Sequence, residues 1–343
     1  LHDVTNIVIG IGDALANYCN KHIRSTAAIR KHYLFLYRSK HYVSNTHVQS
    51  EKITSPPLPM LYMGIVSLIN LTFYSQLLMK KKIVIAGGTG FIGGYLENYF
   101  TNQGYTVKII SRQAHTILWN NENGIIDALE GAEMLINLAG KSVDCRYTEK
   151  NKAEILTSRI DTTTILGNCI LKCTNAPTLW FNSSTATIYR HAEDRPMTES
   201  TGDIGSGFSV GIATQWEKAF FNFNLPSTRQ VALRMAIVLG DEGGVMHPLR
   251  NLVRFGLGGK QGNGNQRFSW IHIDDLKDII LFIQQHQEMS GVYNCAAPGP
   301  VTNKEFMKLL RASMHVSFGL NTPKWMLKIG AIMIHTETEL ILK

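Results

Sequence analysis

The sequence predicts an α/β protein with a doubly wound parallel sheet and a small, mostly helical region after it. Three observations support this prediction. Apolar runs typical of buried strands alternate with helical stretches along the chain from residue 79 onward. The first of these runs leads directly into a glycine-rich turn and a helix. The chain has 343 residues, of which 44% are hydrophobic and 17% charged, which is enough for a large globular core.

The first strand–turn–helix unit indicates that a dinucleotide binds here. Residues 83–85 form an apolar, β-branched run, glycines follow at 87, 90 and 93, and residues 95–100 are predicted to form a helix that ends near Gly104. Backbone N–H groups and the helix dipole attract a pyrophosphate, and glycines let it approach closely. The alternative is an ordinary turn without a ligand. The residues predicted to hold the cofactor are Gly87, Thr89, Gly90, Phe91, Ile92 and Gly93.

The end of the second strand favours NADP over NAD. Residues 105–110 alternate in the manner of a strand and lead into Ser111 and Arg112. An acidic residue at this point would accept a hydrogen bond from the ribose 2′-hydroxyl of NAD. A guanidinium instead suits a 2′-phosphate, which it can bind through two hydrogen bonds. The alternative is that Arg112 is an ordinary solvated surface residue.

Later segments continue the alternation. Strands are predicted at residues 134–140, 179–185 and 230–240, and helices at 149–173 and 217–223. The 134–140 strand ends in small residues at the edge where open α/β sheets bind ligands, so Asn137, Leu138, Ala139 and Gly140 are predicted to line the cofactor. Glycines crowd residues 240–264, which are predicted to form a loop-rich segment over the site, and residues 270–273 follow as ordered chain.

The amino-terminal part of the chain differs from the rest. Residues 1–59 have no clear period, and residues 60–78 carry no charge and precede three lysines. The uncharged run is a possible membrane anchor, but polar residues dilute it and a strand begins immediately after the lysines. Our preferred interpretation is that Met79 is the natural start of a cytoplasmic protein and that residues 1–78 lie upstream of it.

Charge and cysteine content narrow the classes of partner. Residues 1–78 hold seven Lys or Arg against three Asp or Glu, so half of the net charge of +8 lies outside the predicted enzyme-like part. No basic stripe indicates nucleic acid. The five scattered cysteines fit a reducing compartment, and Cys169 and Cys173 are assigned to core packing, so no metal site is predicted. A small-molecule substrate is expected, while the oligomeric state is open.

Taken together, the motifs from Met79 to Lys343 resemble those of an atypical extended short-chain dehydrogenase/reductase. The resembling subfamily is epimerase-like, belongs to the NAD-dependent epimerase/dehydratase superfamily, and carries a small C-terminal domain of uncharacterised function. The matching segments are GGTGFIGG (87–94), SR (111–112), NLAG (137–140), SRIDTT (158–163), TRQVALR (228–234), GLGGKQGNGNQ (256–266) and WIHIDDL (270–276). Residues 325–343 resemble only the start of the last domain. The resemblance implies a Rossmann-type fold.

The resemblance also implies a catalytic Ser or Thr and a Tyr-x-x-x-Lys pair, which this chain lacks. Thr185 stands near the usual hydroxyl, and Tyr189 follows it, so these two are the candidate catalytic residues. Aligning the helix on Glu217 places Ser209 and Ala213 where Tyr and Lys normally stand. Neither residue can supply the usual proton transfer.

Four further polar residues are candidates for binding the substrate: Arg146, Arg159, Gln266 and His272. The two arginines suggest an anionic substrate, although a solvated or salt-bridged arginine is common. His272 has the alternative role of bonding a backbone group. The prediction is an NADP(H)-dependent oxidoreductase or epimerase acting on a small polar substrate such as a sugar. The alternative is a catalytically silent NADP-binding redox sensor.

The predicted domains follow from this assignment. Residues 1–78 are an extension, and residues 79–245 form the NADP-binding domain, to which 270–298 return. Residues 246–269 and 299–343 form substrate-side loops and a shortened C-terminal domain.

Overall fold

The computed structural model describes residues 81–192 and 194–323. Its helices are α4 (Phe91–Asn102), α5 (Glu122–Leu129), α6 (Glu149–Ile170), α7 (Phe208–Phe221), α8 (Met246–Arg254), α9 (Ile273–Gln285) and α10 (Asn303–Ser313), with a short 3₁₀ helix η1 (Ala186–Ile188). Its strands are β1 (Lys82–Ala86), β2 (Thr106–Ser111), β3 (Ile117–Leu118), β4 (Met134–Asn137), β5 (Leu179–Thr185), β6 (Arg229–Met235), β7 (Ile237–Leu239), β8 (Arg267–Phe268), β9 (Trp270–His272), β10 (Gly291–Cys295) and β11 (Val301–Thr302). All of them lie in one of the two units into which the chain divides, residues 74–343.

Seven strands form one sheet in the order β10-β6-β5-β4-β1-β2-β3, and every pair in it is parallel. From β1 the chain builds outward through β2 to β3 and then returns to place β4 on the other side of β1. The strand order therefore reverses between β1 and β4. In doubly wound sheets this reversal leaves a crevice at the carboxyl ends of the two strands. The predicted fold class is confirmed.

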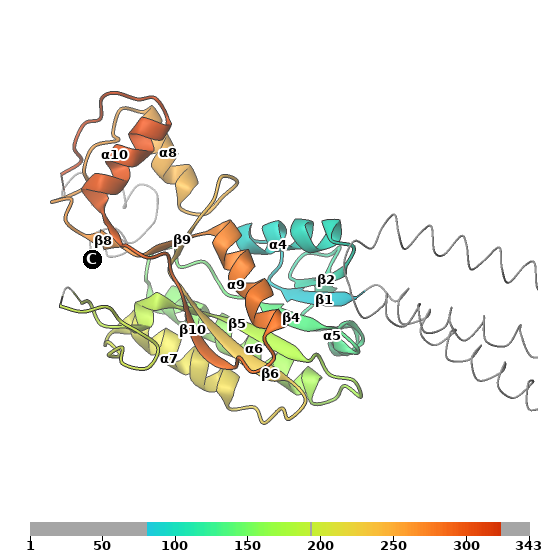
Figure 1. The fold of residues 1–343 in the computed structure, drawn as a ribbon. Helices are drawn as coiled ribbons and strands as arrows, with labels where there is room; N and C mark the ends of the chain where they lie inside the picture. Colours follow the sequence, from blue (N-terminus) through green and yellow to red (C-terminus); the bar gives the residue numbers. More distant parts are fainter. Residues whose placement is uncertain (1–80, 193, 324–343) are drawn as a thin grey trace, which may run out of the picture. The chain divides into compact units, whose positions relative to one another are not determined.

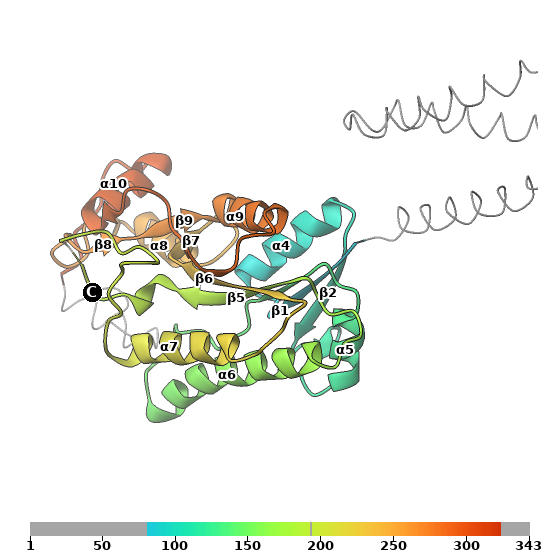
Figure 2. The ribbon, with the colours of Figure 1, turned by 60° about the horizontal axis from the view of Figure 1, so that its bottom comes forward.

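Helices cover both faces of the sheet (Figures 1 and 2). On one face, α4 and α9 pack on alternate strand residues, with Ile83 and Phe100 in that core. On the other face, α5, α6 and α7 cover a second core that contains Trp180 and Phe220. The central strands bury side chains on both faces, which explains why their sequences are continuously apolar rather than alternating.

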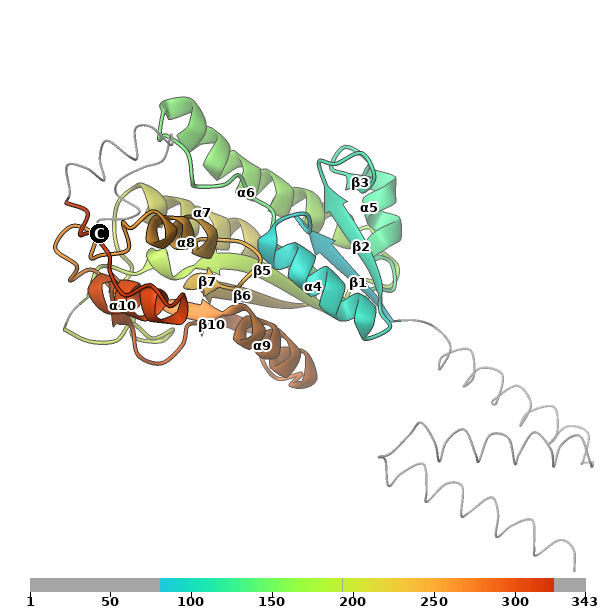
Figure 3. The same cartoon turned by 90° about the horizontal axis from the view of Figure 1, so that it is seen from above.

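A smaller region is formed by chain segments that lie before and after β10. Helices α8 and α10 lie side by side there (Figure 3) and share a third core with Val253 and Met307. The antiparallel pair β8–β11 belongs to this region. Residues 240–264, predicted as loops, thus contain a helix, α8. Its apolar residues, such as Leu249 and Val253, recur at helical spacing, and the surrounding glycines mask this pattern in the sequence.

The strand predicted at residues 230–240 is two strands. β6 ends at Met235, and the Ala236 N–H donates to Cys295 O at 3.0 Å, after which β7 pairs with β9 in a separate small sheet. The helix predicted at 95–100 begins earlier, at Phe91, and the one predicted at 217–223 is the end of α7. Glycines near the start of both helices weaken the helical signal in the sequence there, because glycine is a poor helix former.

The interpretations of residues 1–78 and 325–343 fall outside the described residues. Within the described part of the chain, no helix combines the length and the apolar character needed to cross a membrane.

Candidate functional site

The turn between β1 and α4 is shaped by three glycines with different roles. Gly87 has φ of 75°, and a Cβ there would lie 2.8 Å from the backbone of Ala139. A Cβ on Gly93 would lie 2.5 Å from the backbone of Gly88. At Gly90 the nearest atom to an added Cβ is Gly87 O at 3.8 Å, so this position faces open space. Two glycines permit close backbone packing, and the third borders room for a ligand.

The same turn presents free backbone donors. The first intrahelical bond of α4 runs from Gly94 N to Gly90 O at 2.8 Å, so the N–H groups of Phe91, Ile92 and Gly93 precede it. Gly90 caps the helix without a side-chain hydrogen bond, and the first turn carries no acidic residue. The positive end of the helix dipole is therefore not offset, which suits a pyrophosphate.

The two residues at the end of β2 have different surroundings. Ser111 is buried, and its hydroxyl lies 2.8 Å from Thr116 Oγ1 and accepts from Gln113 N at 3.0 Å, so it holds a turn together. Arg112 is exposed. Of the predicted pair, Arg112 is therefore the one whose side chain is exposed.

At the end of β4, the side chain of Asn137 forms hydrogen bonds within the protein. It is fully buried; its amide donates to Asn182 Oδ1 at 2.7 Å, and its oxygen accepts from Ala139 N at 3.1 Å. Asn137 therefore shapes the strand end rather than facing a ligand. Leu138, Ala139 and Gly140 follow it into the lining of a cavity.

This cavity has a volume of about 390 Å³ and opens beside the β1–β4 crevice. Strand ends, the loop after β4, and helices α6 and α7 form its wall. The lining residues are Ile92, Leu138, Ala139, Gly140, Lys141, Ser142, Val143, Tyr147, Ile155, Arg159, Ser183, Ser184, Thr185, Thr187, Ser209, Ile212, Ala213, Trp216 and Met235. The mixture of apolar walls and hydroxyl groups is typical of a small-molecule site.

Thr185, Ser209 and Ala213 meet in this lining. Ser209 and Ala213 are one helical turn apart on α7, so they share the face that looks into the cavity. The Thr185 hydroxyl accepts a hydrogen bond from Thr187 N at 3.2 Å. The structure thus brings the Thr185 hydroxyl together with Ser209 and Ala213, the two positions where the resembling family has Tyr and Lys, as the alignment on Glu217 predicts. Tyr147 also lines the cavity and was not singled out from the sequence.

Arg159, on α6, is the one of the four predicted substrate residues in this lining. Burial lowers the pKa of its guanidinium. Arg146 is exposed in the loop before α6, next to Tyr147. Gln266 bonds within the smaller region, where its amide donates to Gln261 O at 3.0 Å. His272 caps α9 by accepting from Asp274 N at 3.3 Å, which is the backbone role weighed for it above.

Tyr189 lies in another network behind the cavity. Its hydroxyl donates to Asn294 Oδ1 at 2.8 Å and accepts from Arg234 Nη1 at 2.8 Å. Arg234 in turn binds both carboxylate oxygens of Glu217 at 2.8 and 2.7 Å, and Ser184 Oγ donates to Glu217 Oε1 at 2.5 Å. This hydrogen-bonded ion pair raises the pKa of Arg234.

The network ties α7 to β5 and β6 directly behind Thr185. The sequence signal for it was an arginine inside the apolar run 231–239, because a charge buried in a strand needs a partner.

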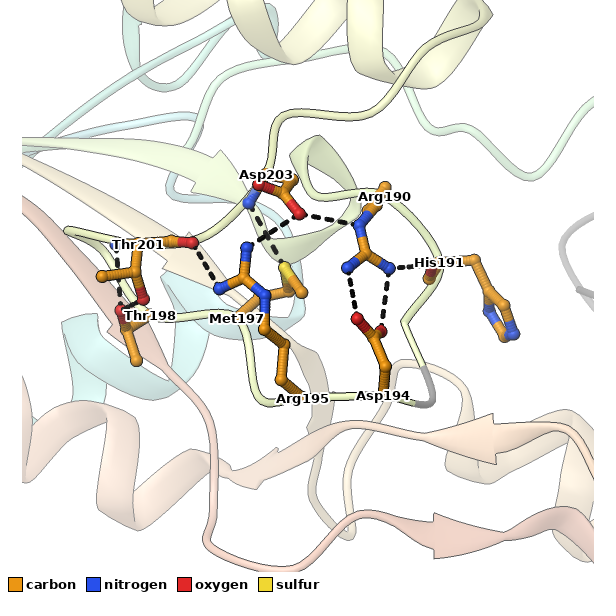
Figure 4. A network of polar contacts seen from close by, with 8 residues as sticks. All are labelled: Arg190, His191, Asp194, Arg195, Met197, Thr198, Thr201 and Asp203. Carbon is orange, nitrogen blue, oxygen red and sulfur yellow. Dashed lines mark hydrogen bonds and ion pairs between the residues drawn. The ribbon is translucent and has the colours of Figure 1, made fainter.

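The segment that joins η1 to α7 is held by a second, exposed network (Figure 4). Arg190 donates to Asp194 and, through Nε, to Asp203 Oδ2 at 2.8 Å, while Arg195 reaches the same Asp203 oxygen at 2.8 Å. A bridge between Tyr189 and Ile204 closes the segment at its base. Hydrogen bonds from Arg190 lower the pKa of Asp194 to about 2.

Among the residues that the structure describes, no group of His, Cys, Asp or Glu could hold a metal ion. Cys169 is buried and Cys173 half-buried, and both are free thiols in or against the α5–α6–α7 core. Burial raises the pKa of Cys173 to about 11, which makes its thiolate scarce at neutral pH.

A parallel sheet with a glycine turn at its switch point and a hydroxyl-lined cavity beside it defines an α/β protein of the dinucleotide-binding class. Comparison with known proteins agrees. Residues 83–209 match the model of the NAD dependent epimerase/dehydratase family. Epimerase family protein YfhF of Bacillus subtilis is 34% identical over 255 residues, which are 71% of this chain and 84% of YfhF. Epimerase family protein SDR39U1 of mouse is 35% identical over 243 residues, which are 68% of this chain and 80% of the mouse protein.

Among solved structures, human epimerase family protein SDR39U1 (isoform 2), crystallised with NADPH, superposes with a TM-score of 0.67. It is 30% identical and covers 74% of this chain and 89% of its own. The chain therefore belongs to the epimerase family of YfhF and SDR39U1, within the NAD dependent epimerase/dehydratase family.

Proposed function

We propose that this protein is an NADP(H)-dependent oxidoreductase or epimerase that acts on a small polar substrate. The observation that carries the proposal is the β1–α4 turn, where open space at Gly90 adjoins the uncapped N-terminus of α4. The human relative that was crystallised with NADPH supports the choice of a phosphorylated cofactor.

The residues present fit a bound NADP. The α4 amides would hold the pyrophosphate, and the exposed guanidinium of Arg112 would meet the 2′-phosphate at the end of β2. Leu138, Ala139 and Gly140 would border the middle part of the bound cofactor. When bound, NADP(H) supplies a hydride acceptor or donor.

The chain's own residues would position the substrate and assist with a proton. Thr185, at the tip of β5, offers a hydroxyl that donates to a substrate oxygen at the cavity wall. Ser209 adds a second hydroxyl from α7. Apolar residues such as Ile212 and Met235 exclude water from the same wall. The smaller region around α8 and α10 would close the substrate side.

One observation favours a second function. Ser209 and Ala213 occupy the cavity face where relatives with ordinary chemistry would need tyrosine and lysine, and neither can shuttle the proton in the usual way. The alternative is therefore a redox sensor that binds NADP(H) without turnover.

Hydride transfer from NADPH to a panel of small carbonyl compounds separates the two functions. An oxidoreductase will oxidise NADPH with at least one compound, and Thr185→Ala will reduce that rate without changing NADPH affinity. An epimerase gives no net oxidation of the cofactor, so its turnover is followed instead by the interconversion of sugar epimers in the presence of NADP⁺. Tight NADPH binding with no turnover on any compound would favour the sensor. Turnover that Thr185→Ala leaves unchanged would remove Thr185 from the chemistry.

A further inference from the structure

We propose that the cavity recognises the acidic group of its substrate, a carboxylate or phosphate, through Arg159. This inference deepens the proposed function and rests on it, because it names the class of substrate that the same site takes. It is carried by the position of Arg159, by the charges around it, and by the donors that it leaves for a ligand.

The guanidinium of Arg159 is fixed in place by the protein. Nη1 donates to Lys141 O at 3.0 Å and to Ile155 O at 2.8 Å. The guanidinium carbon lies 5.2 Å from the centre of the Trp216 ring, at cation–π distance. A Cβ on Gly140 would lie 3.0 Å from this carbon, so the glycine is what lets the arginine lie against the strand end. A group so held loses little entropy when it binds a ligand.

The charge of Arg159 is not balanced within the described part of the chain. Its cavity lining includes two cations, Arg159 and Lys141, and no carboxylate. Lys141 is neutralised, because its ammonium group pairs with Glu154 and donates to Asn151 Oδ1 at 2.7 Å. Burial lowers the pKa of Arg159, yet arginine stays charged at neutral pH. A partly buried cation without a counter-charge is costly, and an anion in the cavity would offset that cost.

The donors that remain suit a planar acid group. Both backbone bonds use Nη1, and the structure shows no hydrogen bond from Nε or Nη2 to any described residue. Nε and Nη2 lie on one edge of the guanidinium and can bind two oxygens of a carboxylate or phosphate side by side. Ser142, Thr187 and Ser209 supply hydroxyl groups in the same lining for the rest of a small polar molecule.

A phosphate of the cofactor is the other possible source of an anion. The uncapped α4 amides and Arg112 already provide positive sites for the cofactor phosphates. We therefore assign Arg159 to the substrate, and the test separates the two sources.

The test compares two probes of similar size that differ in charge, pyruvate and the neutral hydroxyketone acetoin, together with inorganic phosphate. Each is titrated into the full chain saturated with NADPH, and binding is followed by ligand-observed NMR. The variants are Arg159→Gln and Arg159→Lys, with Arg254→Ala on α8 as the matched control, since Arg254 lies outside the cavity.

The expected result is that pyruvate or phosphate binds at least tenfold more tightly than acetoin. Arg159→Gln removes this preference, Arg159→Lys restores part of it, and Arg254→Ala keeps it. NADPH affinity stays within twofold in all three. Circular dichroism verifies folding. If Arg159→Gln fails to fold, Arg159→Lys tests the proposal, because lysine cannot bind two oxygens side by side and should therefore lower the preference for the anion.

Three results would overturn the proposal: no preference for either anion in the native chain, a preference that survives both Arg159 variants, or a tenfold loss of NADPH affinity in Arg159→Gln. The last would assign the arginine to the cofactor. If the native chain bound no NADPH, the proposed function would fail, while titration of the cofactor-free protein with the same probes would still test Arg159.

Discussion

At the residue scale, the glycines of the β1–α4 turn are not equivalent. Gly93 lies against backbone atoms, whereas Gly90 lies against open space. A side chain at Gly93 therefore meets protein, and one at Gly90 meets the volume that we assign to the pyrophosphate. The same sequence pattern thus contains one glycine that close backbone packing requires and one that we assign to binding.

We expect Gly90→Val to abolish NADPH binding and to leave the thermal unfolding temperature nearly unchanged. The valine Cβ has room in the protein, and the backbone of Gly90, with φ of −87° and ψ of 178°, is one that valine adopts. Gly93→Val should instead lower the unfolding temperature, because its Cβ would lie 2.5 Å from backbone. Fluorescence titration and thermal unfolding measure both effects. Equal loss of stability in the two variants would contradict the assignment.

We expect the Arg112 guanidinium to bind the 2′-phosphate of NADPH. Arg112→Ala should weaken NADPH binding by about 1–3 kcal/mol, the usual range for a lost charge-assisted hydrogen bond, and leave NADH binding unchanged. Dissociation constants for both dinucleotides measure the difference, with Arg254→Ala as an exposed arginine control. An equal loss for NADPH and NADH would show that Arg112 does not contact the phosphate.

At the scale of elements, the buried pair of Glu217 and Arg234 fixes α7 against β6. Glu217 also accepts from Ser184, so the pair sets the position of the strand tip that carries Thr185. The sequence contained both residues, but only the packing of helix on sheet brings them together.

Glu217→Leu is expected to lower the free energy of unfolding by about 3–5 kcal/mol, because it leaves Arg234 charged and buried without a partner. The double variant Glu217→Leu/Arg234→Met should lose clearly less, since it removes the charge as well. Urea unfolding of the two variants measures this. Asp278→Asn, at an exposed carboxylate that pairs with Lys277, should change stability by less than about 1 kcal/mol. A double variant less stable than Glu217→Leu would refute this account.

The order of the segment at 189–205 is expected to depend on pH, because it depends on ionised Asp194 and Asp203. Hydrogen bonds from Arg190 lower the pKa of Asp194 from 3.8 to about 2, and the pKa of Asp203 is lowered for the same reason. For a lowered carboxyl pKa, the stabilisation is complete above the unfolded value and is lost as pH falls through the folded value. Hydrogen-exchange protection of this segment should therefore fall between about pH 4 and pH 2.

At neutral pH, Asp203→Asn should expose the same segment, because Asp203 binds both Arg190 and Arg195. We expect faster tryptic cleavage after Arg190, with the global unfolding temperature unchanged; Arg195 precedes a proline, a bond that trypsin does not cleave. Asp241→Asn, which removes an exposed pair with Arg250 elsewhere, is the matched control. Unaltered cleavage in Asp203→Asn would mean that the network does not order the segment.

At the scale of the whole molecule, the described sheet, the β1–α4 turn and the cavity are all formed by residues between 81 and 323. From this and from the interpretation of Met79 as a start, we expect a chain that begins at Met79 to fold and to bind NADPH as tightly as the full chain. Circular dichroism and NADPH titration of both chains measure this. Loss of folding or of affinity on removing residues 1–78 would overturn that interpretation.

The sequence by itself determined the fold class and the glycine turn between β1 and α4, because both depend on local order along the chain. A buried strand, a glycine turn and a helix stand next to one another in residues 82–102, and their period and spacing are visible without any long-range contact. The same reasoning placed Thr185 at a strand tip and Ser209 and Ala213 on one helix face.

Tertiary structure alone decided which polar residues share the cavity. Tyr189 and His272 carry the same chemical groups as a catalytic acid or base, yet one is engaged with Arg234 and the other caps α9. Arg159 and Trp216 are 57 positions apart and meet only because α6 packs against α7. Long-range packing, which no local pattern encodes, therefore determined which of the candidate residues line the cavity.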